Sequence, residues 1–163
     1  MIPVQSCQQV NKEPKILIFG YGNPGRQDDG LGVAIAERIE EWARQVSQTN
    51  IEVDSNYQLN IEDASNISEH DIVYFVDASK EDIDSFIIEE VSPSVKIEFT
   101  THSASPGFIL DLCHKIYRKY PQVYLLHIKG YEWEFMEEMT EKAKNNLEKA
   151  FQFLKKKINI TNH

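Results

Sequence analysis

The chain has 163 residues, of which 41% are hydrophobic and 26% charged, and its formal net charge is −9 at pH 7. This length and composition suit one globular domain with a sizeable core, and the acidic balance argues against a groove that neutralises nucleic-acid phosphates. There is no apolar run of the roughly 20 residues that a membrane helix needs, no secretory pattern at the N-terminus and no C-x-x-C pair. We therefore expect a cytoplasmic protein that binds neither nucleic acid nor membrane.

The first half of the chain alternates between expected strands and helices. Residues 15–20 (KILIFG) form a short apolar run, typical of a strand buried on both faces. Residues 31–46 repeat apolar side chains at helical spacing, which predicts an amphipathic helix. A second strand is expected at residues 51–55, followed by a weak helical signal at 61–68. Residues 71–77 (DIVYFVD) predict a third strand, apolar until its last residue.

The second half continues the alternation. Residues 86–91 (FIIEEV) alternate only partly, which suggests an edge or antiparallel strand, and residues 95–102 fit either a strand or a loop. A helix is expected from a Ser-Pro start over residues 105–120, with an inner stripe of Ile109, Leu112, Ile116 and Tyr120. Residues 123–130 predict another strand, and the apolar stripe of 136–158 predicts a long final helix.

This order of elements predicts an α/β fold, with a doubly wound, mostly parallel sheet and helices on both of its faces. We expect residues 1–14 to form a flexible extension, residues 15–158 a single domain and residues 159–163 a tail. Ligands of such sheets bind beyond the carboxyl ends of the strands. The chain therefore has one preferred place for a site, at that edge of the sheet.

The loop after the first strand has two possible functions. Gly20, Gly22 and Gly25 have the G-x-G-x-x-G spacing that cradles dinucleotide phosphates, and Asp54 at the end of the second strand could bind a ribose. A non-catalytic nucleotide-binding module is therefore the alternative function. Against it, Pro24 removes a backbone donor, and two carboxylates before the helix would repel phosphate. The glycines would then only turn the chain tightly.

Four polar side chains are expected to meet at the carboxyl edge of the sheet: Asp28, Asp29, Asp77 and His102. Taken singly, each of these residues has an explanation that involves no function, since an aspartate can cap a helix or a turn and a loop histidine can be solvated. Together, however, two carboxylates and an imidazole suit a borderline divalent metal such as Zn²⁺ or Ni²⁺. A metal-free acid/base pair of Asp and His is the other arrangement that the sequence allows.

The stretch from Gly20 to Val33 resembles a family motif. It reads G-Y-G-N-P-G-R-Q-D-D-G-L-G-V and follows a buried strand, and further along come VYFVDA with Asp77 and the loop T-H-S with His102. In these marks the chain resembles the maturation endopeptidases of [NiFe]-hydrogenases. The resemblance implies a hydrolase that clips the C-terminal extension from the hydrogenase large-subunit precursor after nickel insertion.

The resemblance also implies a site. Asp29, Asp77 and His102 would be the catalytic and metal-contacting residues, and Asp28 and Asn23 would orient them. The nickel would come with the precursor, which is the expected partner, and no organic cofactor is expected. The metal could activate a water, or it could only position the precursor while Asp29 or Asp28 acts as the base.

The late segment GYEWEF (residues 130–135) has two readings. Its alternating aromatic residues, Tyr131, Trp133 and Phe135, could line a groove for the precursor tail. We favour an extended segment that packs one face on the core, because alternation of this kind is typical of a half-buried strand.

Overall fold

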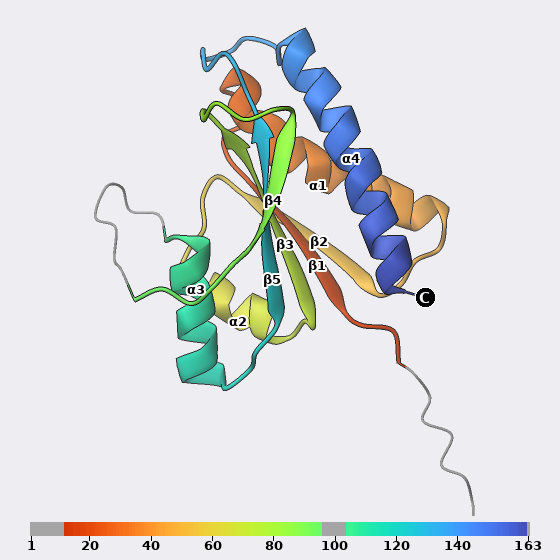
Figure 1. The fold of residues 1–163 in the computed structure, drawn as a ribbon, viewed down its shortest axis with the longest axis vertical. Helices are drawn as coiled ribbons and strands as arrows, with labels where there is room; N and C mark the ends of the chain where they lie inside the picture. Colours follow the sequence, from red (N-terminus) through yellow and green to blue (C-terminus); the bar gives the residue numbers. More distant parts are fainter. Residues whose placement is uncertain (1–11, 96–103, 163) are drawn as a thin grey trace, which may run out of the picture.

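The computed structural model describes residues 12–95 and 104–162. Within them, one five-stranded sheet has the order β2-β1-β3-β5-β4. The strands are β1 (Ile16–Tyr21), β2 (Ile51–Asn56), β3 (Ile72–Ser79), β4 (Phe86–Glu90) and β5 (Gln122–Lys129). All pairings are parallel except that of β4, which runs antiparallel to β5 at the edge (Figure 1). The predicted mostly parallel sheet and the predicted edge strand are therefore confirmed.

Helices cover both faces of this sheet (Figure 1). The helices α1 (Leu31–Gln45) and α4 (Glu141–Thr161) pack on one face, and α2 (Asp63–Ser68) and α3 (Pro106–Leu112) on the other. The doubly wound α/β architecture expected from the sequence is confirmed. None of the helices in the described parts of the chain is long and apolar enough to cross a bilayer.

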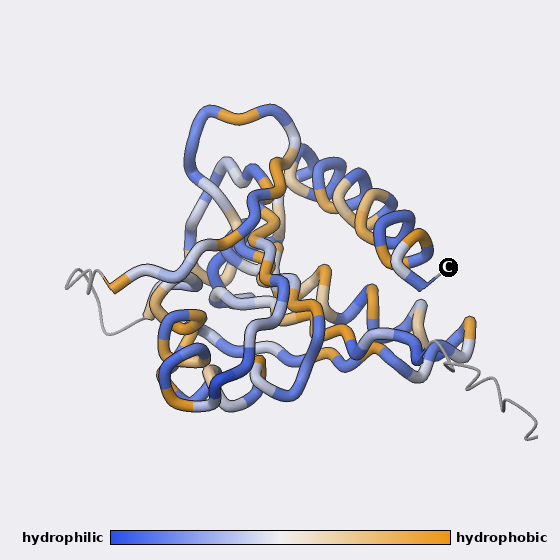
Figure 2. Tube along the Cα trace, turned by 60° about the horizontal axis from the view of Figure 1, so that its bottom comes forward, coloured by the Kyte–Doolittle hydropathy of each residue, from blue (hydrophilic) through white to orange (hydrophobic). Residues whose placement is uncertain are grey.

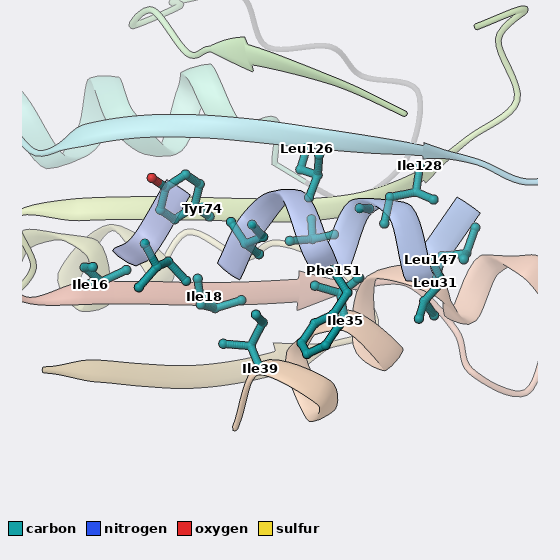
Figure 3. Close-up of a cluster of buried hydrophobic side chains, with 14 of the residues drawn as sticks. Ile16, Ile18, Leu31, Ile35, Ile39, Tyr74, Leu126, Ile128, Leu147 and Phe151 are labelled. Atoms are coloured by element: carbon teal, nitrogen blue, oxygen red, sulfur yellow. The ribbon is translucent and has the colours of Figure 1, made fainter. Parts of the chain in front are cut away.

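The larger of the two cores lies between the sheet, α1 and α4 (Figure 3). Leu31, Ile35 and Ile39 repeat every four residues along α1 and are fully buried, as the helical spacing of the sequence predicts. They meet Leu147 and Phe151 of α4 and the sheet residues that alternate toward this face. Each fully buried side chain of this kind contributes about 1.5–3 kcal/mol, so this core fixes α1 and α4 firmly on the sheet.

The final helix differs from its predicted bounds. It begins at Glu141 rather than near residue 136, because the Thr140 side chain accepts a hydrogen bond from the Ala143 amide (3.2 Å) and caps the helix there. Met136 is 96% exposed, with a positive φ of 62°, so its placement in the inner stripe is wrong. At its other end α4 continues to Thr161, beyond residue 158.

The helix predicted over residues 105–120 is shorter than expected. Ser105 caps α3 as predicted, since its hydroxyl accepts from the Phe108 amide at 3.2 Å. A wider π turn, η2 (Cys113–Tyr117), follows α3 and ends at Arg118, which has a left-handed conformation. This change of periodicity moves Ile116 and Tyr120 out of the predicted inner stripe, and they are 61% and 72% exposed.

Candidate active site

The glycines after β1 serve close packing. A Cβ at Gly20 would lie 2.0 Å from the carbonyl oxygen of Gly32 in α1, so only glycine lets β1 approach this helix. Gly22 has φ = +134° and faces the carbonyl oxygen of Asp29, which a Cβ would approach to 2.2 Å. Such a backbone conformation strains any other residue. The first two glycines of the G-x-G-x-x-G motif therefore hold the end of β1 against the loop and helix that follow.

The loop geometry gives a dinucleotide little to bind. A 3₁₀ turn, η1 (Gln27–Gly30), runs directly into α1, and the Asp29 amide already donates to the Arg26 carbonyl (3.0 Å). Asp54 is exposed on β2, where its carboxylate accepts from the Ser55 amide (2.8 Å) and the Asn66 side chain (3.3 Å). The features on which the nucleotide reading depends thus have structural roles.

Asp29 is held in place by hydrogen bonds within its own loop. One of its carboxylate oxygens accepts from the Asn23 amide at 2.8 Å, and the Asn23 side chain accepts from the Gly25 amide at 2.9 Å. Asn23 therefore both shapes the turn and orients Asp29. The N-cap of α1 is Gly30, with no side-chain cap bond, so the plain reading of Asp28 and Asp29 as helix caps is wrong. Asp29 remains partly exposed.

Asp77 lies at the carboxyl end of β3, close to Asp29. Burial first, and then the negative charge of Asp29, raise the pKa of Asp77 to about 7. The Tyr21 hydroxyl donates a hydrogen bond to the Asp77 carboxylate, and the Tyr21 ring stands edge-on to Phe75 at 6.4 Å. Burial and the Asp77 charge in turn raise the pKa of Tyr21 well above its usual value. The structure thus brings two of the predicted site residues together.

The third predicted ligand, His102, lies outside the described residues. Among the residues that are described, no three His, Cys, Asp or Glu side chains converge to hold a metal ion. Asp77 follows Phe75 by two positions, so both point to the sheet face that α2 and α3 cover. The described chain resumes at residue 104 and enters α3 on that same face.

Asp28 has a different role from its neighbour Asp29. Its side chain is fully buried and accepts four hydrogen bonds from residues 130–140, the segment between β5 and α4 that we call the strap. The donors are the amides of Tyr131 (2.7 Å), Glu132 (3.1 Å) and Thr140 (2.8 Å), and the Thr140 hydroxyl (2.8 Å). Asp28 therefore fastens the strap to the loop that carries Asp29.

Further bonds join the strap to the same loop. The Arg26 guanidinium donates to the Trp133 carbonyl (2.9 Å), and the Gln27 side chain bonds both Glu132 (3.0 Å) and the Glu134 amide (3.0 Å). The strap does not pack on the core as an extended segment, because Tyr131 and Phe135 are 38% and 67% exposed. That reading of the aromatic alternation is therefore wrong.

Two participants of the site escaped the sequence reasoning. Tyr21 occupies the variable position of the G-x-G motif, so the motif does not single it out. Its position at the carboxyl end of the first strand, next to the strand that carries Asp77, could have indicated its role. The strap escaped because its partners are about a hundred residues away in the chain: Tyr131, for example, is separated from Asp28 by 103 positions.

Solved structures share this architecture over most of both chains. No protein-family model and no curated protein matches the sequence. The [NiFe] hydrogenase maturation protease HycI from Thermococcus kodakarensis KOD1 is 22% identical with a TM-score of 0.72, and the match covers 90% of this chain and 94% of that one. The hydrogenase maturating endopeptidase HybD from E. coli is 18% identical with a TM-score of 0.69, over 90% and 93% of the two chains. An endopeptidase from Escherichia coli is 18% identical with a TM-score of 0.65, over 86% and 89%. This chain has the hydrogenase maturation protease fold.

Asp29 and Asp77, which we call the carboxylate pair, are the candidate site among the described residues. A carboxyl group whose pKa lies near 7 can exchange a proton at physiological pH, and a carboxylate beside it can bind a cation or accept a proton. The Cys113 thiol is a poor nucleophile, because it is buried and burial raises its pKa. The arrangement suits acid/base or metal-assisted hydrolysis rather than thiol chemistry.

Proposed function

We propose that the protein is an endopeptidase that removes the C-terminal extension of a nickel-loaded [NiFe]-hydrogenase large-subunit precursor. The observation that carries the proposal is the place of Asp29 and Asp77 at the carboxyl edge of the sheet, where α/β folds bind their ligands and where the charge of Asp29 raises the pKa of Asp77. The fold supports it, since solved proteins with this fold are named as hydrogenase maturation proteases.

The carboxylate pair fits the nickel ion that the precursor brings as part of the substrate. Burial and the neighbouring charge disfavour the ionised form of Asp77, and a cation beside it would favour that form. Two carboxylates and the imidazole of His102 would make a mixed oxygen and nitrogen donor set, which nickel accepts. A precursor without nickel would leave the two acids facing each other without a cation, so the site would select the loaded form.

The two aspartates of the loop take separate tasks in this proposal. Asp29 is partly exposed and oriented by the Asn23 amide, so it can accept the proton of an attacking water. Asp28 is not available as a base, because it is buried and surrounded by four donors from the strap. Tyr21 orients Asp77 through its hydroxyl. The nickel, when bound, would polarise the scissile carbonyl or lower the pKa of the water.

Cleavage of the precursor tests the proposal directly. The purified protein is incubated with nickel-loaded and nickel-free large-subunit precursor, and the products are weighed by mass spectrometry. We expect cleavage of the loaded form only. Asp29→Asn, Asp77→Asn and His102→Ala should each abolish it, whereas Asp54→Asn on β2 is the matched control and should cleave normally. Normal cleavage by the first three variants, or none by the wild-type protein, would refute the assignment.

A further inference from the structure

We propose that the strap is a docking surface for the body of the protein substrate, and that it takes a segment in which an apolar side chain stands next to lysine or arginine. The inference rests on the proposed function, because the occupant is the precursor. It concerns a surface outside the carboxylate pair. The strap is rigid and acidic, exposes apolar side chains at its tip and borders a groove at its base.

The strap is held firmly although it is a long loop. Besides the bonds to Asp28, the Met136 amide donates to the Gly25 carbonyl at 2.9 Å, and the Asp28 amide donates to the Glu132 carbonyl at 3.2 Å. Met136 has a left-handed φ of 62°, a conformation that is strained for a residue with a side chain. A strained backbone conformation persists only where the surrounding structure enforces it, and such conformations are more frequent at functional sites.

This rigid segment presents apolar side chains to solvent. Met136 is 96% exposed and Phe135 is 67% exposed, and the Arg26 guanidinium lies 5.3 Å from the centre of the Phe135 ring. Figure 2 shows α4, into which the strap leads, with hydrophilic and hydrophobic residues in alternation along the helix. Methionine and aromatic side chains are enriched in the centres of protein interfaces. Their exposure on a fixed backbone therefore indicates a partner.

The charge of the surface indicates which partner. The strap carries Glu132, Glu134, Glu137 and Glu138 and contains no lysine or arginine. Glu137 and Glu138 are exposed, and neither forms an ion pair with another described residue. Complementary charge guides one surface to another and fixes their register. The partner is accordingly basic around its apolar contact.

A groove at the base of the strap suits the same chemistry. It has a volume of about 390 Å³ and lies between the strap, α1 and the loop after β1. Pro24, Val33 and Met139 give it an apolar lining. Glu37, Glu137 and Glu138 add three carboxylates, against one cation among the described lining residues, Lys144, which is paired with Glu141 at 3.1 Å. A lysine or arginine side chain would lay its aliphatic stem on the apolar lining and its charged head against the carboxylates.

The position of the surface connects docking to cleavage. The strap is bonded to residues 25–28, immediately before Asp29, so a protein held on it is held beside the carboxylate pair. A second copy of this chain is the less suitable occupant. It carries a net charge of −9 and would bring the same acidic surface against itself.

The test separates docking from chemistry. Glu137→Lys/Glu138→Lys is compared with the matched control Glu40→Lys/Glu41→Lys, which makes the same charge change at exposed positions of α1. With nickel-loaded precursor we expect the strap variant to raise KM at least tenfold and to leave kcat within twofold, while the control keeps both. A synthetic peptide spanning only the scissile bond should bind both variants equally.

A second variant guards against misfolding. Met136→Gly removes the exposed side chain and relieves the left-handed backbone, but it also makes the unfolded chain more flexible, so it should leave Tm nearly unchanged and still raise KM for the precursor severalfold. Unchanged KM in both strap variants, with normal wild-type cleavage, would overturn the docking inference and leave the proposed function intact. A wild-type dimer that the strap substitutions dissociate would assign the surface to self-association instead. Absence of wild-type cleavage would refute the proposed function itself.

Discussion

Asp28 accepts hydrogen bonds from both the amide and the hydroxyl of Thr140, each at 2.8 Å, across 112 positions of the sequence. The same threonine caps α4 through the Ala143 amide. One buried carboxylate therefore joins the loop before α1 to the start of α4, and the strap between β5 and α4 is fixed as a consequence. These elements meet at the upper edge of the sheet in Figure 1.

Replacement of Asp28 should destabilise the protein strongly. Asp28→Ala leaves four donors of the strap without their acceptor, and Asp28→Asn turns an amide donor toward Thr140 or the strap amides. We expect either change to lower the free energy of unfolding by about 2–4 kcal/mol in urea titrations. Asp29→Ala, the neighbouring control, should cost less than about 1 kcal/mol. Equal losses at the two positions would contradict the role of Asp28 as the fastener.

The pKa of Asp77 predicts a pH-dependent stability. It is about 3.8 in an ordinary aspartate and about 7 in the folded protein, so between these values the native state binds more protons than the unfolded chain. The contribution of Asp77 to the free energy of unfolding is fully present below pH 3.8, and it is lost as the pH rises through 7. In Asp77→Asn the group cannot ionise, so the variant should gain stability relative to wild type as the pH rises from 5 to 8, by on the order of 4 kcal/mol at most. Asp54→Asn should show no such gain, and a pH-independent difference for Asp77→Asn would refute the shift.

Tyr21 should tune the activity through Asp77. Its hydroxyl stabilises the ionised carboxylate, so Tyr21→Phe should raise the pKa of Asp77 further while the ring keeps its contact with Phe75. In the cleavage assay we expect about a tenfold lower rate at pH 7 and a pH profile displaced upward. Tyr57→Phe, at an exposed position, is the control. If the cleavage rate falls but the pH dependence of the rate is unchanged, the Tyr21 hydroxyl does not act on Asp77.

Gly22→Ala should displace Asp29. The residue has φ = +134° and faces the Asp29 carbonyl oxygen, which a Cβ would approach to 2.2 Å. We expect a loss of at least about 1 kcal/mol in unfolding free energy together with loss of cleavage. Gly25→Ala is a matched control in the same loop, since its Cβ would meet only the Asn23 side-chain oxygen at 3.2 Å. Similar behaviour of the two variants would show that the tight turn at Gly22 is not needed.

Nucleotide titration should give no binding. The glycines of the loop approach backbone oxygens of α1 and of Asp29 rather than leaving room for phosphate, and Asp28 and Asp29 add negative charge there. We expect isothermal titration with NAD and with FAD to show no heat of binding up to millimolar ligand. Submicromolar affinity for either would restore the nucleotide-binding alternative.

The sequence by itself determined the elements and the edge at which they deliver polar side chains. The periodicity of α1 and the apolar runs of β1 and β3 are local properties, because burial of one face or of both faces sets their pattern. The topology rule for α/β sheets then predicted that Asp28, Asp29, Asp77 and His102 would meet at the carboxyl edge. Asp29 lies near enough for its charge to raise the pKa of Asp77, while His102 lies outside the described residues.

The tertiary structure alone decided what two adjacent aspartates do. The family resemblance implied different roles for Asp28 and Asp29, but it did not reveal that Asp28 holds the strap, whose donors lie more than a hundred residues further along the chain. The start of α4 is set by Thr140, which caps the helix and also bonds to Asp28. A hydrogen bond between distant segments leaves no periodic trace in the sequence, because its geometry exists only after the sheet has brought the two segments together.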